Sequence, residues 1–540
     1  MPELIFNGKR IDIAVGETLL AAIARAGEAA HSVASSCPGA GRCKECIVQV
    51  LAGSDALSDW TQAESFLRHH SDSEVAVHRL ACQARITRAD AVVRVEAFKR
   101  KLDIAMNGRA AADTFDPWIT RDGARLLCDG KEFGNHAGSI HGLAVDVGTT
   151  TCVLHLVDLS TGDTLDMRAF ENPQRFGGSD VIHRISYDGH NPGQLHRTII
   201  AYLNREIRSL PVDPNGIVAL VVAGNPTMRD LFFGIDVRSI GQSPFMSATQ
   251  ADILAGRRRS TAVWTGGQEL GIDIHPQGRV YGMPLISNHV GADTAAVLAT
   301  LPLNDRPFMM IDIGTNTEVV AGCESRLLAA SCAAGPAFEG GRLGCGIAAC
   351  EGAITRMRRR PDGWDLSLIG NGPARGICGS GLVDILAELR RTEEIDVLGR
   401  FDDGETRVTV ADSPPLHFTR SDASELAQTK AAIGLGQAVL LRHLGIGPGD
   451  LRAYYLAGAF ANHIDLESGR RIGLLLPVPD GHVVRIGNAS VEGAKGVLRS
   501  RSCRDRIEGL VRQIEHLELE KEPDFFDLFA EMTQLQPISA

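Results

Sequence analysis

The chain has 540 residues, of which 44% are hydrophobic, so it is long enough for several globular domains. Its formal net charge of −11 argues against a general nucleic-acid-binding protein, because phosphate contacts require a basic surface. Twelve cysteines in a chain of this length do not make a disulfide framework, which favours a reducing cytoplasm. The N-terminus has no signal-peptide pattern and no run of about 18 apolar residues occurs, so we expect no membrane span.

The first predicted elements form a small β-rich domain over residues 1–98. Residues 3–15 alternate apolar and polar side chains around Asn7-Gly8, a dipeptide that favours a tight hairpin turn. The other elements expected in this domain are a helix over 18–26 and strands over 47–51 and 92–97.

Four cysteines in this domain are spaced like the ligands of an iron–sulfur cluster. Cys37, Cys43 and Cys46 read C-x5-C-x2-C. Cys82 follows after an interval of about the length of a small β-fold. Structural zinc usually takes two close pairs, whereas this asymmetric set is typical of a [2Fe–2S] ferredoxin of the adrenodoxin type, in which one loop wraps the cluster. A zinc site and unligated thiols are the alternatives.

Residues 99–140 are polar and rich in glycine, and they show no sustained hydrophobic period. We therefore interpret them as a linker with one short helix.

Two similar segments follow this linker. HGLAVDVGTTTCVLHLVDL and FMMIDIGTNTEVVAG each contain an apolar strand, an Asp, a glycine turn and a second strand. Such a repeat indicates two similar halves that face each other. A strand and not a helix follows each turn, and no G-x4-G-K-[ST] signature occurs there, so neither turn is a P-loop. We divide the remaining chain into a first lobe over 141–303 and a second lobe over 304–540.

Each turn carries the residue types that a nucleotide and Mg²⁺ require. Gly148 and Gly314 let backbone amides approach phosphate oxygens. Asp146 and Asp312 are placed to hold Mg²⁺ through its waters, because this ion keeps much of its hydration shell. A single turn of this kind also suits an ordinary surface loop, but two with flanking strands favour a phosphate site. The additional side-chain donors expected at the turns are Thr149, Thr150, Thr315 and Asn316.

A third glycine-rich strand end occurs in YYLAGAFANHIDL. Its small residues would give a nucleotide a backbone wall where a side chain does not fit. The residues that we assign to this wall are Ala457, Gly458, Ala459 and Phe460.

Two further segments are candidates for the same site. Glu318 and Glu339 are expected near the γ-phosphate, where either orients water or Mg²⁺; capping of a backbone amide is the alternative. Gly379, Ser380 and Gly381 precede a helical stretch and would aim backbone amides at a phosphate or the ribose. The alternative for these three residues is a plain turn before a core helix.

With these segments in hand, the C-terminal four fifths resembles the sugar kinase, Hsp70 and actin superfamily of ATPases. DVGTTT and DIGTNTE resemble its phosphate loops, and LAGAF resembles its adenosine-contacting segment. Joined to the N-terminal ferredoxin, the chain resembles the reductive activators of corrinoid proteins. The segments that continue this resemblance are NPQRFG, GNPTM, SCAAGPAFEGG, GICGSGLVD and GNASVEGA.

The resemblance implies a multidomain α+β and α/β fold, in which a β-grasp [2Fe–2S] ferredoxin and a linker precede two ribonuclease H-like ATPase lobes. It also implies ATP-dependent delivery of one electron to a corrinoid protein, which returns Co(II) to Co(I) for methyl transfer. The implied cofactors are a [2Fe–2S] cluster, ATP and Mg²⁺, and the implied partners are the corrinoid protein, an electron donor and a second copy of the chain.

Two other functions stay open at this point. One is a small-molecule kinase with an accessory ferredoxin, because the same ATPase fold phosphorylates sugars. The other is electron transfer to a non-corrinoid acceptor, with a nucleotide that only regulates docking. The activators of 2-hydroxyacyl-CoA dehydratases share the ATPase fold but hold a cubane cluster between subunits, and the N-terminal ferredoxin argues against that family.

Overall fold

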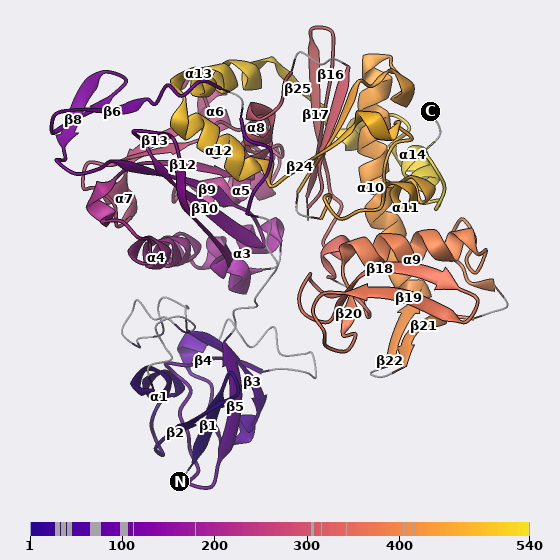
Figure 1. Ribbon diagram of the computed structural model, residues 1–540, viewed down its shortest axis with the longest axis horizontal. Helices are drawn as coiled ribbons and strands as arrows, with labels where there is room; N and C mark the ends of the chain where they lie inside the picture. Colours follow the sequence, from indigo (N-terminus) through magenta and orange to yellow (C-terminus); the bar gives the residue numbers. More distant parts are fainter. Residues whose placement is uncertain are drawn as a thin grey trace.

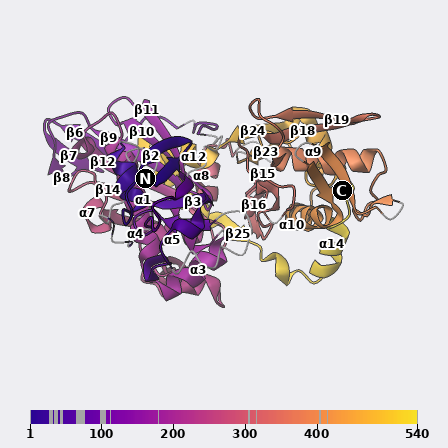
Figure 2. The same cartoon turned by 90° about the horizontal axis from the view of Figure 1, so that it is seen from below.

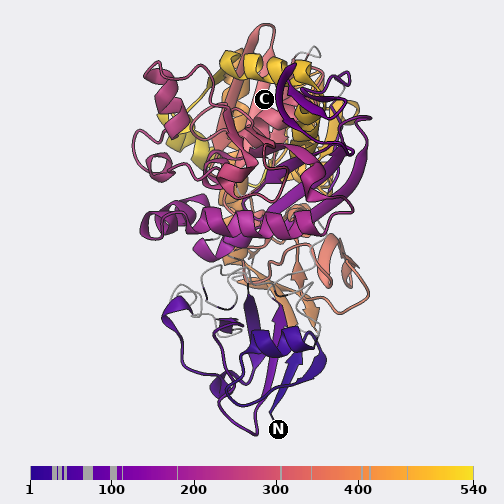
Figure 3. The ribbon, with the colours of Figure 1, turned by 90° about the vertical axis from the view of Figure 1, so that its left-hand side faces the viewer.

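The protein is seen in a computed structural model that falls into three bodies. Figures 1 and 3 show a small N-terminal domain as a separate body, and Figure 2 shows the two larger lobes side by side. Within the described ranges, no helix has both the length and the apolar character needed to cross a membrane. The structure describes residues 2–26, 33, 39, 41, 46–64, 77–97, 106–111, 113–178, 180–303, 307–314, 316–341, 343–402, 405–412, 415–458 and 460–538.

The N-terminal domain is a five-stranded sheet with one helix, made of β1 (Glu3–Phe6), β2 (Lys9–Asp12), α1 (Leu19–Arg25), β3 (Ile47–Ala52), β4 (Val77–Leu80) and β5 (Val92–Ala97). The strand order is β2-β1-β5-β3-β4, and β1 pairs with β5 in parallel while the other pairs are antiparallel. Asn7 and Gly8 both have positive φ angles, of +49° and +83°, which confirms the predicted hairpin turn. Thr18 caps α1 by accepting a hydrogen bond from the Ala21 amide.

The described part of the expected linker, residues 106–111 and 113–140, contains a second small sheet and not the one short helix that we predicted. Its strands are antiparallel and run in the order β6-β7-β8. The turns fall at Asp122-Gly123 and Asp129-Gly130, and Asp-Gly is a hairpin signal that the composition of the segment hid. Asp129 and Gly130 both have positive φ, as a tight hairpin requires. The strands are β6 (Ile119–Asp122), β7 (Arg125–Cys128) and β8 (Lys131–Asn135).

The first lobe is a six-stranded sheet made of β9 (His141–Val147), β10 (Thr151–Asp158), β11 (Thr164–Glu171), β12 (Ile217–Gly224), β13 (Val263–Gly266) and β14 (Arg279–Gly282). Its order is β11-β10-β9-β12-β14-β13. Every residue of β12 is buried, because this strand pairs in parallel with both β9 and β14 at the centre of the sheet. The helices of this lobe are α3 (Val181–His190), α4 (Gln194–Arg208), α5 (Pro226–Phe232), α6 (Ala248–Leu254), α7 (Gly267–Leu270) and α8 (Ala292–Ala299).

The second lobe repeats this topology with β15 (Phe308–Asp312), β16 (Thr317–Cys323), β17 (Arg326–Cys332), β23 (Ala453–Ala457), β24 (Val483–Gly487) and β25 (Ile514–His516). Its order is β24-β23-β15-β16-β17-β25. In both lobes an antiparallel three-stranded meander continues into two parallel strands, here β23 and β24. The two similar halves predicted from the repeated strand-turn-strand segments are therefore confirmed.

Helices and two small sheets complete the second lobe. The long helix α10 starts with a capping box between Thr419 and Asp422 and ends at Gly445, whose φ is +69°. The helices are α9 (Gly379–Arg391), α10 (Arg420–Leu444), α11 (Leu466–Arg471) and α14 (Phe525–Met532). The additional strands are β18 (Ala353–Arg360), β19 (Gly363–Leu368), β20 (Gly376–Ile377), β21 (Arg407–Asp412) and β22 (Pro415–Thr419).

Two helices late in the chain, α12 (Ala489–Arg499) and α13 (Arg501–Leu510), return to the first lobe. Helix α12 lies against β9, β12 and α8. Its Gly493 meets α8 so closely that a Cβ there would lie 1.8 Å from the Ala296 carbonyl oxygen. The chain therefore crosses between the lobes again, and the domain limits drawn along the sequence stay a prediction.

Candidate functional site

The first predicted phosphate turn, between β9 and β10, is held by polar side chains on its inner side. Asn172 donates to the Gly148 carbonyl oxygen at 2.7 Å, and Asn225 donates to the Thr149 hydroxyl at 3.0 Å. The buried guanidinium of Arg184 donates to the Thr149 carbonyl oxygen at 2.6 Å. Because its carbonyl oxygens and the Thr149 hydroxyl are engaged on the inner side, the turn is fixed before a ligand arrives.

The second phosphate turn lies at the end of β15 and touches the third glycine-rich segment. Gly458 has a φ of +90°, and a Cβ on it would lie 3.0 Å from the Asp312 carboxylate. Only glycine therefore permits this close approach of the two segments. A Cβ on Gly314 would lie 3.2 Å from the Asn316 carbonyl oxygen on the opposite side of the turn. The predicted site residues Thr315 and Ala459 lie outside the described residues.

Four carboxyl groups from the two lobes have raised pKa values, and the charge of Asp293 acts on the other three. Burial, followed by the nearby carboxylate of Asp293, raises the pKa of both Asp146 and Asp312 to about 7. Burial also raises the pKa of Asp293 to about 6. Glu318 is buried, and burial together with Asp293 and Asp312 raises its pKa as well. Acids that resist ionisation side by side fit a divalent cation, whose charge removes their repulsion.

Direct ligation of an ion is a separate question. Across the parts of the chain that are described, no three acidic, histidine or cysteine side chains converge as a ready-made metal site. The roles of Asp146 and Asp312 in holding Mg²⁺ through its waters stay predictions.

One predicted catalytic acid reaches the opposite lobe and the other does not. The Thr150 hydroxyl donates to the Glu339 carboxylate at 2.9 Å, which joins the first phosphate turn to the second lobe. Glu318 instead is only 5% exposed and accepts a long hydrogen bond of 3.4 Å from Ser331. The geometry therefore favours Glu339 over Glu318 as the acid beside a γ-phosphate, and both catalytic roles stay predictions.

The third segment packs against the start of α9. The rings of Phe460 and Phe338 stack with their centroids 5.3 Å apart. A Cβ on Gly379 would lie 2.7 Å from the Phe460 ring, so Gly379 is required by this packing. Gly379, Ser380 and Gly381 form the first turn of α9 and do not precede it. Ala457 ends β23 and pairs with Asp312 in the sheet.

The side chain of Ser380 is already engaged, because its hydroxyl donates to the Thr355 carbonyl oxygen at 2.8 Å. Gly381 lies against β18, where a Cβ would be 2.5 Å from the Ile354 carbonyl oxygen. These contacts explain both residues by packing, and their predicted role in nucleotide binding is untested.

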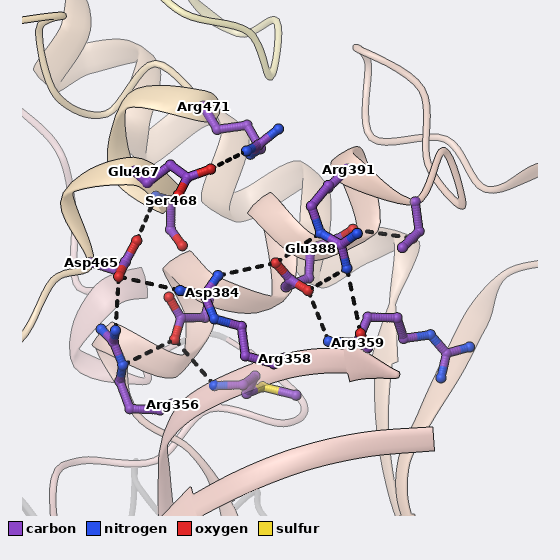
Figure 4. A network of polar contacts seen from close by, with 12 residues as sticks. Arg356, Arg358, Arg359, Asp384, Glu388, Arg391, Asp465, Glu467, Ser468 and Arg471 are labelled. Carbon is purple, nitrogen blue, oxygen red and sulfur yellow. Dashed lines mark hydrogen bonds and ion pairs between the residues drawn. The ribbon is translucent and has the colours of Figure 1, made fainter. Parts of the chain in front are cut away.

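An open polar groove of about 610 Å³ starts two residues after Phe460. Figure 4 shows the ion-pair network at its edge, in which Asp465 accepts from Arg356 at 2.8 Å and contacts Arg358 at 3.4 Å. Because these arginines belong to β18 and Asp465 caps α11, the network joins the two walls of the groove. The lining residues are Arg356, Asn462, His463, Ile464, Asp465, Leu466, Glu467, Asp480 and Arg485.

Two of the four predicted cluster ligands are described, and they lie together. Cys46 and Cys82 are joined by a hydrogen bond between their sulfur atoms, which lowers the pKa of Cys82 to about 6. Gln83 donates to the Cys82 sulfur at 3.4 Å, and the Gly41 amide also hydrogen-bonds it. Thiolates in contact with donated N–H groups are the environment that a [2Fe–2S] cluster requires. The other two predicted ligands, Cys37 and Cys43, lie outside the described residues.

A buried ion pair fixes the strand that leads to Cys82. Glu64 and Arg79 have side-chain exposures of 0% and 3%, and their charged groups are 2.8 Å apart. The Glu64 carboxylate also accepts a hydrogen bond from the Leu80 amide at 3.0 Å, two residues before Cys82.

Several residues of the candidate site carry no local signal in the sequence. Asp293 looks like an ordinary acid in the first turn of a helix, a position that the helix dipole favours by itself. Asn172 and Asn225 lie in segments that carried the resemblance, but no pattern indicated their roles, nor that of Arg184. Ser490 was missed for the same reason, although its hydroxyl donates to the Asp146 carboxylate at 2.9 Å.

Comparison with known protein families identifies each part of this architecture. Residues 4–87 match a 2Fe-2S iron-sulfur cluster binding domain, and residues 141–306 match the RACo middle region. Residues 306–539 match the C-terminal domain of RACo, the ASKHA domain. The chain belongs to the RACo family. The expected multidomain fold, with a ferredoxin followed by an ASKHA-type ATPase, is confirmed, and with it the expected [2Fe–2S] cluster, ATP and Mg²⁺.

Individual relatives agree with this family. The corrinoid activation enzyme RamQ of Eubacterium limosum is 32% identical over 72% of this chain and 69% of its own length. The Co(II) methylated amine-specific corrinoid protein reductase of Methanosarcina barkeri is 24% identical over 69% of this chain and 73% of its own. The solved structure of a reductive activator for a corrinoid, iron-sulfur protein covers 100% of this chain with a TM-score of 0.68 and 26% identity.

Proposed function

We propose that this chain uses ATP to deliver one electron to a corrinoid protein and so returns its cobalt from Co(II) to Co(I). The observation that carries this function is the joint presence of a cysteine pair, Cys46 and Cys82, in the ferredoxin domain and of two acids with raised pKa values, Asp146 and Asp312, at the matching turns of two ATPase lobes. The relatives named for corrinoid activation and for Co(II) corrinoid protein reduction support the choice of acceptor.

In the ATPase part, the chain's own residues prepare the first turn for a nucleotide. The Gly148 turn is held rigid from behind by Asn172 and Arg184, so its backbone is preorganised before a nucleotide binds. Glu339 is positioned by Thr150 on the opposite lobe, where a carboxylate can accept a proton from an attacking water. Mg²⁺, when bound, neutralises charge that develops on the phosphates.

In the ferredoxin part, the chain's residues prepare thiolates. Donors from Gln83 and Gly41 stabilise the negative sulfur of Cys82. A [2Fe–2S] cluster supplies a one-electron carrier, with a potential near about −400 mV in plant-type ferredoxins. For one electron, each 59 mV of unfavourable potential costs about tenfold in equilibrium, so coupling to ATP has a clear thermodynamic use.

The proposed function also includes a cellular compartment and two further partners. None of the ten described cysteines forms a disulfide, as expected of a cytoplasmic protein in a reducing compartment. The electron donor and a homodimer are carried over from the family resemblance alone.

An anaerobic assay tests the proposed function. The chain is mixed with a Co(II) corrinoid protein, a reductant and Mg·ATP, and Co(I) is followed by its visible absorbance. We expect Co(I) to accumulate only with ATP. Equal accumulation without ATP would reject the energy coupling, and ATP consumption that requires a small metabolite would indicate a kinase.

Variants of two cysteines connect the same assay to the cluster. Cys82→Ser is expected to lose the visible bands of the cluster and the Co(I) signal together. Cys323→Ser is the control, because Cys323 lies half-buried at the end of β16 in the second lobe. Full iron content in the Cys82 variant would refute the ligand assignment.

A further inference from the structure

The chain that leaves the ferredoxin domain is bonded to a turn of the ATPase core. We call residues 106–111 and 113–118 the strap, and Figure 1 shows part of it in purple beside α12. The Arg109 amide donates to the Ile486 carbonyl oxygen at 2.8 Å. The Asn488 amide donates to the Asn107 carbonyl oxygen at 3.1 Å, which completes an antiparallel bridge with the turn.

The far end of the strap is bonded to the core as well. The Asp116 amide donates to the Arg499 carbonyl oxygen at 3.0 Å, and the Arg501 amide donates to the Asp116 carbonyl oxygen at 2.7 Å. The indole of Trp118 is fully buried and donates to the Val497 carbonyl oxygen at 3.0 Å. The strap is thus docked along the end of β24 and along helix α12.

The turn that receives the strap also contacts the nucleotide site. We define this turn as residues 486–490. Its Gly487 carbonyl oxygen accepts a hydrogen bond from the Gly458 amide at 3.0 Å, in the predicted adenosine segment. Its Ser490 hydroxyl donates to the Asp146 carboxylate at 2.9 Å, and the Asn488 side chain hydrogen-bonds the same acid. One five-residue turn therefore joins the strap to two segments of the nucleotide site.

The strap and the turn pack so closely that no side chain fits between their backbones. A Cβ on Gly108 would lie 2.6 Å from the carbonyl oxygens of Ile486 and Asn488. A Cβ on Gly487, whose φ is +65°, would lie 2.7 Å from the Asn107 carbonyl oxygen. Because the two backbones are in direct contact, a displacement of the turn either moves the strap or breaks its hydrogen bonds.

Docking of the strap also limits the reach of the ferredoxin domain. Strand β5 ends at Ala97 and the strap starts at Met106. The intervening chain spans about 30 Å when fully extended, and it would span about 75 Å if the strap were released up to Trp118. The state of the strap therefore decides how far the cluster can travel toward a partner.

We infer that the turn 486–490 transmits the state of the nucleotide site to the strap, with Ser490 and Asn488 as positioning residues for Asp146. The inference depends on the proposed function only for the statement that Asp146 belongs to a nucleotide site. A bound Mg·nucleotide orders Asp146, the turn follows through Ser490, and the strap hydrogen bonds become more protected. The coupling is reciprocal, because two linked equilibria shift each other by the same factor.

Hydrogen exchange on the full chain tests this inference without any corrinoid protein. The amide of Arg109 is followed with and without a saturating non-hydrolysable ATP analogue and Mg²⁺. We expect the nucleotide to slow its exchange about fivefold or more, the lower end of typical coupling. Ser490→Ala leaves the strap contacts intact but removes one of the two side-chain hydrogen bonds from the turn to Asp146, so it should clearly reduce the slowing.

Ser325→Ala is the matched control, because Ser325 is exposed in the turn between β16 and β17 and should keep the full response. Nucleotide binding is confirmed for each variant by a fluorescent analogue. Unchanged exchange at Arg109 in the nucleotide-bound wild type would overturn the inference, and so would equal slowing in the Ser490 variant.

A second variant tests the coupling from the side of the strap. Gly108→Val places carbon atoms where the turn's carbonyl oxygens lie, so it should release the strap. By reciprocity, this variant should bind the fluorescent ATP analogue about fivefold or more weakly. Unchanged affinity together with a released strap would contradict the inference.

The two proposals fail in different ways. Slowed exchange at Arg109 in a chain that fails to form Co(I) would reject the proposed function alone. ATP-dependent Co(I) formation without slowed exchange would reject this inference alone.

Discussion

The hydroxyl of Thr150 donates to the carboxylate of Glu339 at 2.9 Å, so the first phosphate turn of one lobe is bonded to the other lobe. The contact lies where the two lobes approach the predicted γ-phosphate. Closure of the lobes on a nucleotide would bring Glu339 to the terminal phosphate and hold it there through Thr150.

We expect Glu339→Gln to lower kcat for ATP hydrolysis by about 10²- to 10⁴-fold, the usual contribution of a general base, with little change in KM. Thr150→Val, which removes only the positioning hydroxyl, should have a smaller effect on kcat. Steady-state phosphate release measures both. Glu515→Gln, on the outer edge strand β25, is the control. A full-activity Glu339 variant would exclude this residue as the base.

Asp312→Asn is expected to suppress ATP hydrolysis and leave the visible spectrum of the cluster unchanged. Burial and the Asp293 charge raise the pKa of Asp312 to about 7, so ionising this group costs the folded state increasing free energy as pH rises from about 4 to about 7. The neutral amide removes that cost. At pH 8 without Mg²⁺, Tm of the variant should therefore equal or exceed that of the wild type.

Addition of Mg·nucleotide should reverse this order, because the ligand stabilises only the protein that binds it. Thermal unfolding with and without Mg·nucleotide measures the effect. A variant that hydrolyses ATP normally would show that Asp312 is not part of the site.

The features that could be predicted from the sequence are those that depend on residues close together in the chain. The strand-turn-strand repeat at Asp146 and Asp312 predicted both lobes. An apolar strand that ends in Asp and Gly can be recognised from neighbouring residues alone, without knowledge of distant contacts. The sheet at 119–135 also has a local signal in the sequence, its two Asp-Gly turns. The polar composition of the segment led us to interpret it as a linker instead.

The remaining features depend on contacts between distant parts of the chain. Ser490 lies far from Asp146 in the sequence, and only the return of α12 to the first lobe brings the two together. Asp293 has the appearance of a helix-start acid, and its second role appears only when the second lobe faces it. Neither relationship leaves a periodic or local signal.

The buried ion pair near the cluster gives a stability prediction. Glu64→Gln leaves Arg79 charged and buried without its counterion, and it weakens the bond to the Leu80 amide. Breaking one partner of a buried pair costs about 3–5 kcal/mol, so the cluster should be lost at a clearly lower temperature. Bleaching of the visible bands on heating measures this effect.

The surface pair between Arg88 and Asp55 in the same domain is the control for that experiment. Asp55→Asn should shift the bleaching temperature little, because exposed pairs contribute at most about 1 kcal/mol. An equal shift in both variants would contradict the assigned role of Glu64.

A buried lysine gives the protein a pH-dependent stability. Lys430 on α10 is 1% exposed, and its ammonium group donates to the Gln534 carbonyl oxygen at 2.5 Å near the C-terminus. Burial lowers its pKa to about 7. The unfolded chain therefore binds the extra proton between about pH 7 and pH 10, and the wild type gains stability as pH rises through that window, by at most about 1.4 kcal/mol per pH unit.

Lys430→Met removes this titration and keeps a side chain of similar length. The difference in unfolding free energy between wild type and variant should move in favour of the wild type from pH 7 to pH 9, as measured by urea denaturation. Lys131→Met, at an exposed position on β8, should show no such trend. A pH-independent difference for Lys430→Met would mean that the lysine stays charged in the folded protein, with a hydrated path to its ammonium group.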